Sequence, residues 1–226
     1  MRIDVITGFP KLLESPLRES MIKRAQEQKV VEIVVHDLRD YAADRHRSID
    51  DTPFGGGAGM ILKPEPVFSC IEKLQGERRY DDVMYLSADG ERLTQPLANE
   101  MSLAKNLILL CGHYKGIDER IREALITREI SIGDYVLTGG EIPALVLMDA
   151  IIRLIPGVLH DGESLLTDSF QGELLDAPAY TRPADFRGMK VPDVLLSGNH
   201  AEIEAWRESR RLARTKARRN SMQAHS

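Results

Sequence analysis

The sequence has little cysteine, few aromatic residues and no long apolar run. Its two cysteines, Cys70 and Cys111, lie far apart in a chain of 226 residues. They offer no metal-ligand spacing and fit a reducing compartment. No apolar run is long enough to span a bilayer, and the first ten residues, MRIDVITGFP, lack the apolar core and cleavage site of a secretory signal. We therefore expect a cytoplasmic protein.

The composition is that of a folded domain with an uneven charge. Hydrophobic residues make up 42% and charged residues 29%, which argues against wholesale disorder. The net charge is −5, but residues 201–226 contain seven basic and three acidic residues, so this end carries +4 and the remainder −9. A basic tail on an acidic body is typical of polyanion binding. The alternative is a solvated terminal helix.

Short apolar runs alternate with helical patterns along the first two thirds of the chain. We predict strands at 3–7, 30–38, 83–87, 106–112 and 128–132. We predict helices at 15–28, 65–74, 94–104, 117–124 and 141–155, and a loop from Arg45 to Lys63. Continuous apolar strands separated by helices indicate an α/β fold with a mostly parallel sheet covered on both faces.

The composition of the sequence changes after Pro156, where turn residues become frequent. We predict an α/β domain at 1–159, a linker at 160–167 and a small helical C-terminal domain at 168–226. Asn199 is suited to cap the last helix, with Glu202 placed as in a capping box.

Parallel sheets bind ligands at the carboxyl ends of their strands. Three predicted strands end in glycine-bearing loops, at 87–90, 112–116 and 133–140. We expect these loops to form a cup of backbone groups that suits a neutral or zwitterionic ligand, with Leu86, Tyr135 and Leu137 as apolar walls. A bulky residue at Gly139 or Gly140 should block the cup by crowding and by lost φ freedom. The alternative is an ordinary turn between strand and helix.

The glycine run FGGGAGM at 54–60 does not match a nucleotide-binding loop. No GK[ST] follows it, and no strand leads directly into it. Two alternatives stay open. One is a tightly turned surface loop, and the other is close approach to a polyanion with Arg45, Arg47 and Lys63 supplying charge.

Six segments carry a resemblance. They occur in a fixed order over nearly the whole chain: FGGGAGM, CGHYKGIDERI, SIGDYVLTGGEIPAL, IPGVL, DSF followed by LLDAPAYTRP, and VPDVLLSGNHAEIEAWR. Together they resemble the bacterial tRNA (guanine-N1)-methyltransferases of the SPOUT superfamily. The resemblance implies a deep trefoil knot made by the three loops, an obligate homodimer with a shared active site, and S-adenosyl-L-methionine as methyl donor. The implied substrate is tRNA, methylated at N1 of the guanosine immediately 3′ of the anticodon.

The resemblance also implies roles for single residues. Asp168 matches the family's general base, and its alternative is a helix N-cap. Arg153 matches the family's catalytic arginine, and its alternative is an ion pair with Asp149 four residues earlier. Asp176 is a second acidic candidate near the substrate. The positions that match cofactor contacts are Tyr85, Leu86, Gly112, Ile132, Gly133, Tyr135, Leu137, Gly139 and Gly140.

For tRNA, the resemblance points to Asn199 and His200, and Arg207 lies on a basic helix face with Arg210 and Arg214. The sequence departs from the family at Lys115, where many members have an acidic residue. The resemblance also implies a dependence on magnesium. A lysine cannot replace an acid that contacts a metal or the cofactor's amino group, so the role of position 115 and the dependence on magnesium both stay open. The rival functions are a non-catalytic RNA-binding protein and a nucleotide-binding enzyme.

Overall fold

The computed structural model describes residues 1–158 and 174–223. Contacts within the chain divide it into two units, Met1–His160 and Asp161–Ser226. The predicted linker at 160–167 and the predicted base Asp168 lie outside the described residues, so the domain boundaries stay predictions.

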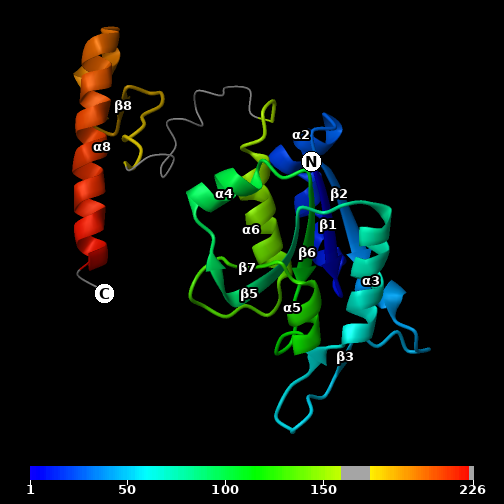
Figure 1. The fold of residues 1–226 in the computed structure, drawn as a ribbon. Coiled ribbons are helices and arrows are strands. Elements are labelled where there is room, and N and C mark those ends of the chain that lie inside the picture. Colours follow the sequence, from blue (N-terminus) through cyan, green and yellow to red (C-terminus); the bar gives the residue numbers. More distant parts are fainter. Residues whose placement is uncertain (159–173, 224–226) are drawn as a thin grey trace. The chain divides into compact units, whose positions relative to one another are not determined.

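The first unit is built on a five-stranded parallel sheet in the order β2-β1-β6-β5-β7 (Figure 1). Its strands are β1 (Arg2–Thr7), β2 (Glu32–Asp37), β5 (Asp82–Arg92), β6 (Asn106–Cys111) and β7 (Arg128–Ser131). The predicted α/β class with a mostly parallel sheet is confirmed. A short antiparallel pair, β3 (Asp50–Asp51) and β4 (Ile61–Leu62), stands apart from this sheet.

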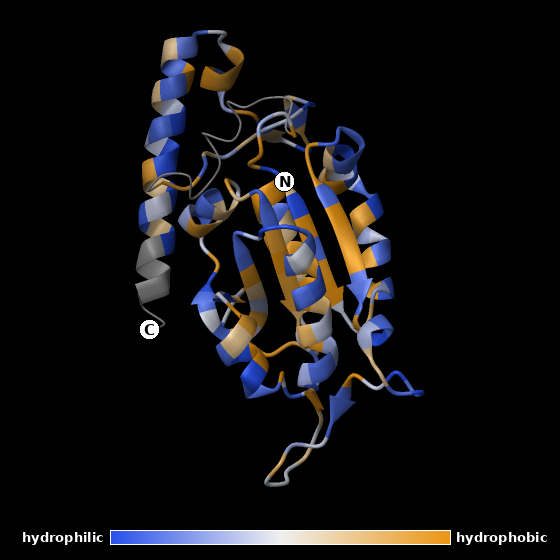
Figure 2. Cartoon of the chain, turned by 45° about the vertical axis from the view of Figure 1, so that its right-hand side comes forward, coloured by the Kyte–Doolittle hydropathy of each residue, from blue (hydrophilic) through white to orange (hydrophobic). Residues whose placement is uncertain are grey.

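The alternation of side chains along the strands divides the core into two layers. Ile3, Val5, Leu107 and Leu109 belong to one cluster, with buried residues of α2 (Ser20–Glu27), α4 (Gln95–Met101) and α6 (Glu141–Ile152). Ile6, Ile108 and Leu110 belong to the other, with α3 (Pro64–Glu77) and α5 (Glu119–Leu125). Helices therefore cover both faces, which is why the strands are hydrophobic along their length (Figure 2).

The predicted helices differ from the observed ones mainly at their ends; α4, for example, ends at Met101 rather than Ala104. The predicted helix at 15–28 is confirmed over α2 but not before it, because α1 (Lys11–Glu14) and a 3₁₀ turn (Pro16–Arg18) precede α2 and are separated from it by an extended residue, Glu19. Ser20 then has a positive φ of 51°, which a continuous α-helix does not contain. Helix α6 ends at Ile152 rather than Ile155, and Arg153 is its C-cap.

The second unit contains a small hairpin and a long helix. The hairpin pairs β8 (Asp185–Phe186) with β9 (Met189–Lys190), and a 3₁₀ turn (Asp193–Leu196) follows. Helix α8 runs from His200 to Gln223. Its cap is the predicted one, because the backbone N–H of Glu202 donates to the Asn199 side chain at 3.5 Å. Among the described residues, the helices are all too short or too polar to cross a membrane.

Candidate functional site

A cavity of about 390 Å³ lies at the carboxyl ends of β6 and β7 and beside residues 85–89 of β5. The three loops that the sequence singled out supply most of its wall, and we call this cavity the cup. Every residue predicted to contact a cofactor lines it: Tyr85, Leu86, Gly112, Ile132, Gly133, Tyr135, Leu137, Gly139 and Gly140. The structure therefore brings together nine positions that span 56 residues of sequence.

The loops of the cup are joined by their own backbones. Gly140 N–H donates to the carbonyl of Gly112 at 2.7 Å, and His113 forms an antiparallel bridge with Gly139. The register of β5 against β7 shifts between Leu86 and Glu91, which both lie opposite Ile130, so residues 87–90 leave the ladder and form the third loop. Because the loops at 112–116 and 133–140 bond to one another, they give the cup a fixed floor before any ligand binds.

Crowding requires glycine at three positions of the cup, Gly112, Gly139 and Gly140, whereas Gly116 and Gly133 have positive φ of 131° and 153°. A Cβ on Gly140 would lie 2.7 Å from Cα of Cys111, and one on Gly112 would lie 2.7 Å from the Tyr85 ring. A Cβ on Gly139 would collide with the side chains of Glu141 and His113. The predicted need for φ freedom is wrong, because Gly140 has φ −81° and Gly139 is not among the residues with positive φ. The predicted steric requirement is what the geometry supports.

A buried carboxylate that the sequence reasoning missed lies behind the cup. Glu141, only 1% exposed, begins α6, and the Thr7 hydroxyl donates to its Oε1 at 2.6 Å. Its Oε2 lies 3.8 Å from Nδ1 of His113, a buried nitrogen without a hydrogen-bond partner. The ring of His113 packs against Phe9, with centroids 4.2 Å apart. The sequence did contain a signal for this residue: an acid stands directly before the apolar run of α6. Charged side chains are seldom buried unpaired, so an acid at the start of a buried helix needs a partner.

The charges around the cup nearly balance. Asp89 and Glu119 are its acidic lining residues, and Lys115 and Arg122 its basic ones. The guanidinium of Arg122 lies 5.3 Å from the centre of the Tyr85 ring. Burial raises the pKa of the Tyr85 hydroxyl, although Arg122 opposes this shift, so the phenol is neutral at physiological pH. A cup of this kind suits a zwitterion better than a triphosphate.

The glycine run at 54–60 is anchored to the cup at its base. Lys115 N–H donates to the carbonyl of Met60, and Leu62 N–H to that of Gly116, each at 3.0 Å. Gly55, Gly56 and Gly57 have positive φ and open space around them, and Phe54 at the start of the run is fully exposed. This favours the surface-loop alternative.

Two of the three cations that the polyanion alternative needs are engaged elsewhere. Arg47 is paired with Asp40, and Lys63 Nζ lies 3.9 Å from Asp44. Ion pairs of this kind leave less free positive charge beside the glycine run, so close approach of a polyanion there gains little from them.

Arg153 does not lie at the cup of its own chain. It caps the C-terminus of α6, whereas Gly140 caps the N-terminus. A helix rises 1.5 Å per residue, so the two caps are separated by about 20 Å. Its backbone N–H donates to the Asp149 carbonyl at 3.4 Å.

The remaining predicted residues lie in the second unit. Arg211 Nη2 lies 3.8 Å from the Asp176 carboxylate, and Arg214 Nη1 donates to the Asp176 carbonyl at 3.2 Å, so this acid holds its segment against α8. Asn199 caps α8, and His200 and Arg207 are exposed on its first turns. Within 1–158 and 174–223, no cluster of three His, Cys, Asp or Glu side chains is arranged to hold a metal.

A parallel sheet with a crowded glycine cup at its carboxyl ends is the architecture of α/β proteins that hold a small ligand at this edge of the sheet. Comparison with known sequences makes the class specific. The family model described as tRNA (Guanine-1)-methyltransferase TrmD matches residues 1–225. A tRNA (guanine-N(1)-)-methyltransferase of Chlorobium chlorochromatii is 64% identical over 219 residues, covering 97% of this chain and 95% of the relative. Those of Chlorobaculum tepidum and Flavobacterium psychrophilum are 59% and 58% identical, and cover 98% and 97% of this chain and 96% and 97% of their own lengths. The chain belongs to the tRNA (guanine-1)-methyltransferase family.

Proposed function

We propose that this protein transfers a methyl group from S-adenosyl-L-methionine to N1 of a guanosine in tRNA, at position 37 immediately 3′ of the anticodon. One observation carries the proposal: the nine positions that match the family's cofactor contacts line a single cavity. The family match along residues 1–225 supports it.

The cup fits this cofactor. Its volume lies in the range of small-molecule sites, and its acidic and basic lining residues are equal in number. When bound, S-adenosyl-L-methionine supplies a methyl group on a positively charged sulfur that is already a good leaving group. The cup therefore has to hold the donor in line with its acceptor, and a backbone floor of Gly112, Gly139 and Gly140 supplies that rigidity.

The acceptor needs a base, because N1 of neutral guanine carries a proton. We assign Asp168 to this step: its carboxylate accepts the N1 proton as the new carbon–nitrogen bond forms. Arg153 then places a positive charge beside guanine O6, where negative charge grows as the proton leaves. Asp176, Asn199, His200 and Arg207 are the proposed tRNA contacts.

The site is shared between two copies of the chain in this proposal. Arg153 caps the end of α6 opposite the cup, so a second copy has to bring its arginine to the cup of the first. Exposed apolar side chains beside the cup and along α6 suit such an interface: Tyr135, Val136, Leu137, Ile142 and Val146. The proposal includes the family's deep trefoil knot, formed in this chain by the three loops of the cup.

Magnesium does not fit the residues that surround the cup. Lys115 occupies a position at which many members of the family have an acid, and the described residues contain no cluster suited to a metal. No step of the mechanism is assigned to a metal.

The test is methyl transfer from a labelled donor to unmodified tRNA, followed by mapping of the modified nucleoside. We expect one label per tRNA, as N1-methylguanosine at position 37. Asp168→Asn should keep donor affinity and lose most single-turnover activity, about 100-fold or more. Normal rates in this variant would remove Asp168 as the base. Binding of donor and tRNA without transfer by the wild type would favour the non-catalytic alternative, and thermal stabilisation by ATP alone would favour the nucleotide-binding one.

A further inference from the structure

The β8–β9 hairpin stands out in the second unit because it buries almost nothing. Every residue from Thr181 to Lys190 is exposed. The hairpin is held by its own bonds: Arg187 and Gly188 turn the chain with φ of 56° and 83°, and Gly188 N–H donates to the Asp185 side chain at 2.9 Å. Its shape is therefore set by turn geometry, which presents the strands to solvent.

One face of this hairpin is apolar. Phe186 and Met189 are directly paired across the strands, so their side chains share a face, and they are 52% and 65% exposed. The guanidinium of Arg187 lies 5.2 Å from the centre of the Phe186 ring. The result is an aromatic platform with a cation over it.

We propose that this face binds an unpaired base of the tRNA by stacking on Phe186, with Arg187 contacting the base or its phosphate. The inference rests on the proposed function and names a surface for it. Aromatic rings and arginine planes are the groups on which proteins stack splayed-out RNA bases.

The charge around the hairpin agrees with RNA as the occupant. Arg182, Arg187 and Lys190 outnumber the one acid, Asp185. Residues 174–223 hold ten basic and six acidic side chains, so they carry +4 in a chain of −5. The rest of the chain, at −9, repels a polyanion, and RNA therefore gains most from basic surfaces such as this one.

The second aromatic platform of the unit differs from the hairpin. Trp206 on α8 is half-buried, with Tyr180 at 6.4 Å and Arg210 at 5.5 Å from its ring. Neighbours already occupy this ring, whereas Phe186 has only Arg187 over it among the ring contacts of the described residues. The ring of Phe186 is therefore more open to a base than that of Trp206.

The experiment measures tRNA binding by the full-length chain at several salt concentrations. Phe186→Ala should weaken binding about tenfold or more with an unchanged salt slope, and Phe186→Tyr should keep it, because the ring still stacks. Arg187→Ala should weaken binding and reduce the salt slope by about one. Leu103→Ala, which removes another exposed apolar side chain (83% exposed), is the matched control and should bind as the wild type does.

The outcomes separate this proposal from the proposed function. Wild-type protein that binds no tRNA contradicts the proposed function itself. Wild-type protein that binds tRNA, with Phe186→Ala equally tight, overturns the hairpin alone. If Phe186→Ala changes the mass measured by light scattering and leaves tRNA affinity unchanged, the face is covered by a second copy, and the proposal also fails. Donor affinity should be the same in all four variants.

Discussion

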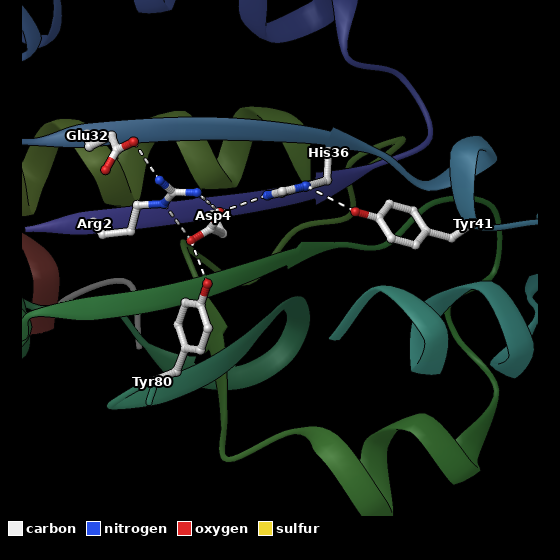
Figure 3. A network of polar contacts seen from close by, with 6 residues as sticks. All are labelled: Arg2, Asp4, Glu32, His36, Tyr41 and Tyr80. Carbon is white, nitrogen blue, oxygen red and sulfur yellow. Dashed lines mark hydrogen bonds and ion pairs between the residues drawn. The ribbon is translucent and has the colours of Figure 1, made fainter. Parts of the chain in front are cut away.

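Two carboxylates are buried in the first unit, and their surroundings differ. Asp4, on β1, is fully buried and accepts hydrogen bonds from Arg2, His36 and Tyr80 at 2.7–2.8 Å (Figure 3). Glu141 is just as buried, but it has one short bond, from Thr7, and a more distant His113. Asp4 is not among the residues that line the cup, whereas Glu141 supports its floor. A saturated network stabilises the sheet, and the one with fewer short bonds lies beside the cup, which is the proposed donor site.

The balance at Asp4 is electrostatic. Burial alone would raise the pKa of the Asp4 carboxyl, but hydrogen bonds from His36, Arg2 and Tyr80 outweigh it and hold this pKa well below its ordinary value. Tyr80 donates one of these hydrogen bonds, and burial together with the Asp4 carboxylate raises the pKa of its hydroxyl. The carboxylate is therefore ionised, paired and costly to disturb.

The largest effect should come from Asp4→Asn. Removing one member of a buried charged network typically costs about 3–5 kcal/mol in the free energy of unfolding. Chemical denaturation measures this loss, and donor affinity of the folded variant should be unchanged. Glu32→Gln is the control: Glu32 also pairs with Arg2 but is largely exposed, so its loss should cost under about 1 kcal/mol. Equal losses in the two variants would contradict the role given to Asp4.

Asp4→Asn should also change how the free energy of unfolding depends on pH. The pKa of Asp4 is lower in the folded state than in the unfolded chain, so its contribution to stability is fully present above the unfolded value of about 3.9 and is lost as the pH falls below it. The difference in unfolding free energy between wild type and Asp4→Asn should therefore be constant near neutral pH. It should shrink below about pH 4.

Gly140→Ala should have the next largest effect, and it should act on the cup. The added Cβ would meet the backbone of Cys111 and Gly112 at 2.7 and 2.9 Å, so the turn has to move and its 2.7 Å bond to Gly112 is lost. A displacement of 1 Å at a reacting centre can cost about 100-fold in rate, and we expect a loss of this size in methyl transfer.

The control for Gly140→Ala is Gly76→Ala in α3, where an added Cβ meets no atom within 4 Å. This helix substitution should stabilise the protein by up to about 1 kcal/mol and leave activity unchanged. Full activity in Gly140→Ala would show that the cup tolerates added volume.

The sequence predicted those features that burial determines. Apolar runs such as 106–112 indicate a strand buried on both faces, and parallel strands bring their terminal loops to one edge. These two rules predicted the parallel sheet and the position of the cup at one of its edges. The resemblance supplied the nine lining positions, and their assembly in one cavity is a finding of the structure. Their role in binding stays a proposal.

Features that depend on distant pairing could not be read from the sequence. Thr7 and Glu141 are 134 residues apart, and no local pattern joins them.

The break at Glu19 depends on one extended residue inside a helical pattern, where propensity differs by only tenths of a kcal/mol. Glycine in the cup suggested φ freedom, whereas the cause at Gly140 is a neighbouring strand end that the sequence does not place. The distance from Arg153 to the cup likewise needed the fold.

The smallest effect should come from Glu141→Gln, and it tests the comparison most directly. The amide keeps the size of the side chain and an oxygen that accepts from Thr7, so the unfolding free energy should fall by about 1 kcal/mol at most. It removes the negative charge beside His113, which lines the cup and adjoins Gly139. We expect about tenfold weaker donor binding by calorimetric titration, which corresponds to 1.4 kcal/mol, with kcat nearly unchanged at saturating donor.

Thr7→Val is the companion of Glu141→Gln, because it removes the hydroxyl that donates to Oε1 and keeps the charge. Leaving that oxygen without its donor should cost about 1–3 kcal/mol of stability, and donor affinity should fall less than in Glu141→Gln. The opposite pattern, in which Glu141→Gln is as unstable as Asp4→Asn and binds the donor normally, would mean that both carboxylates only hold the sheet together. The incomplete bonding of Glu141 would then have no connection with the cup.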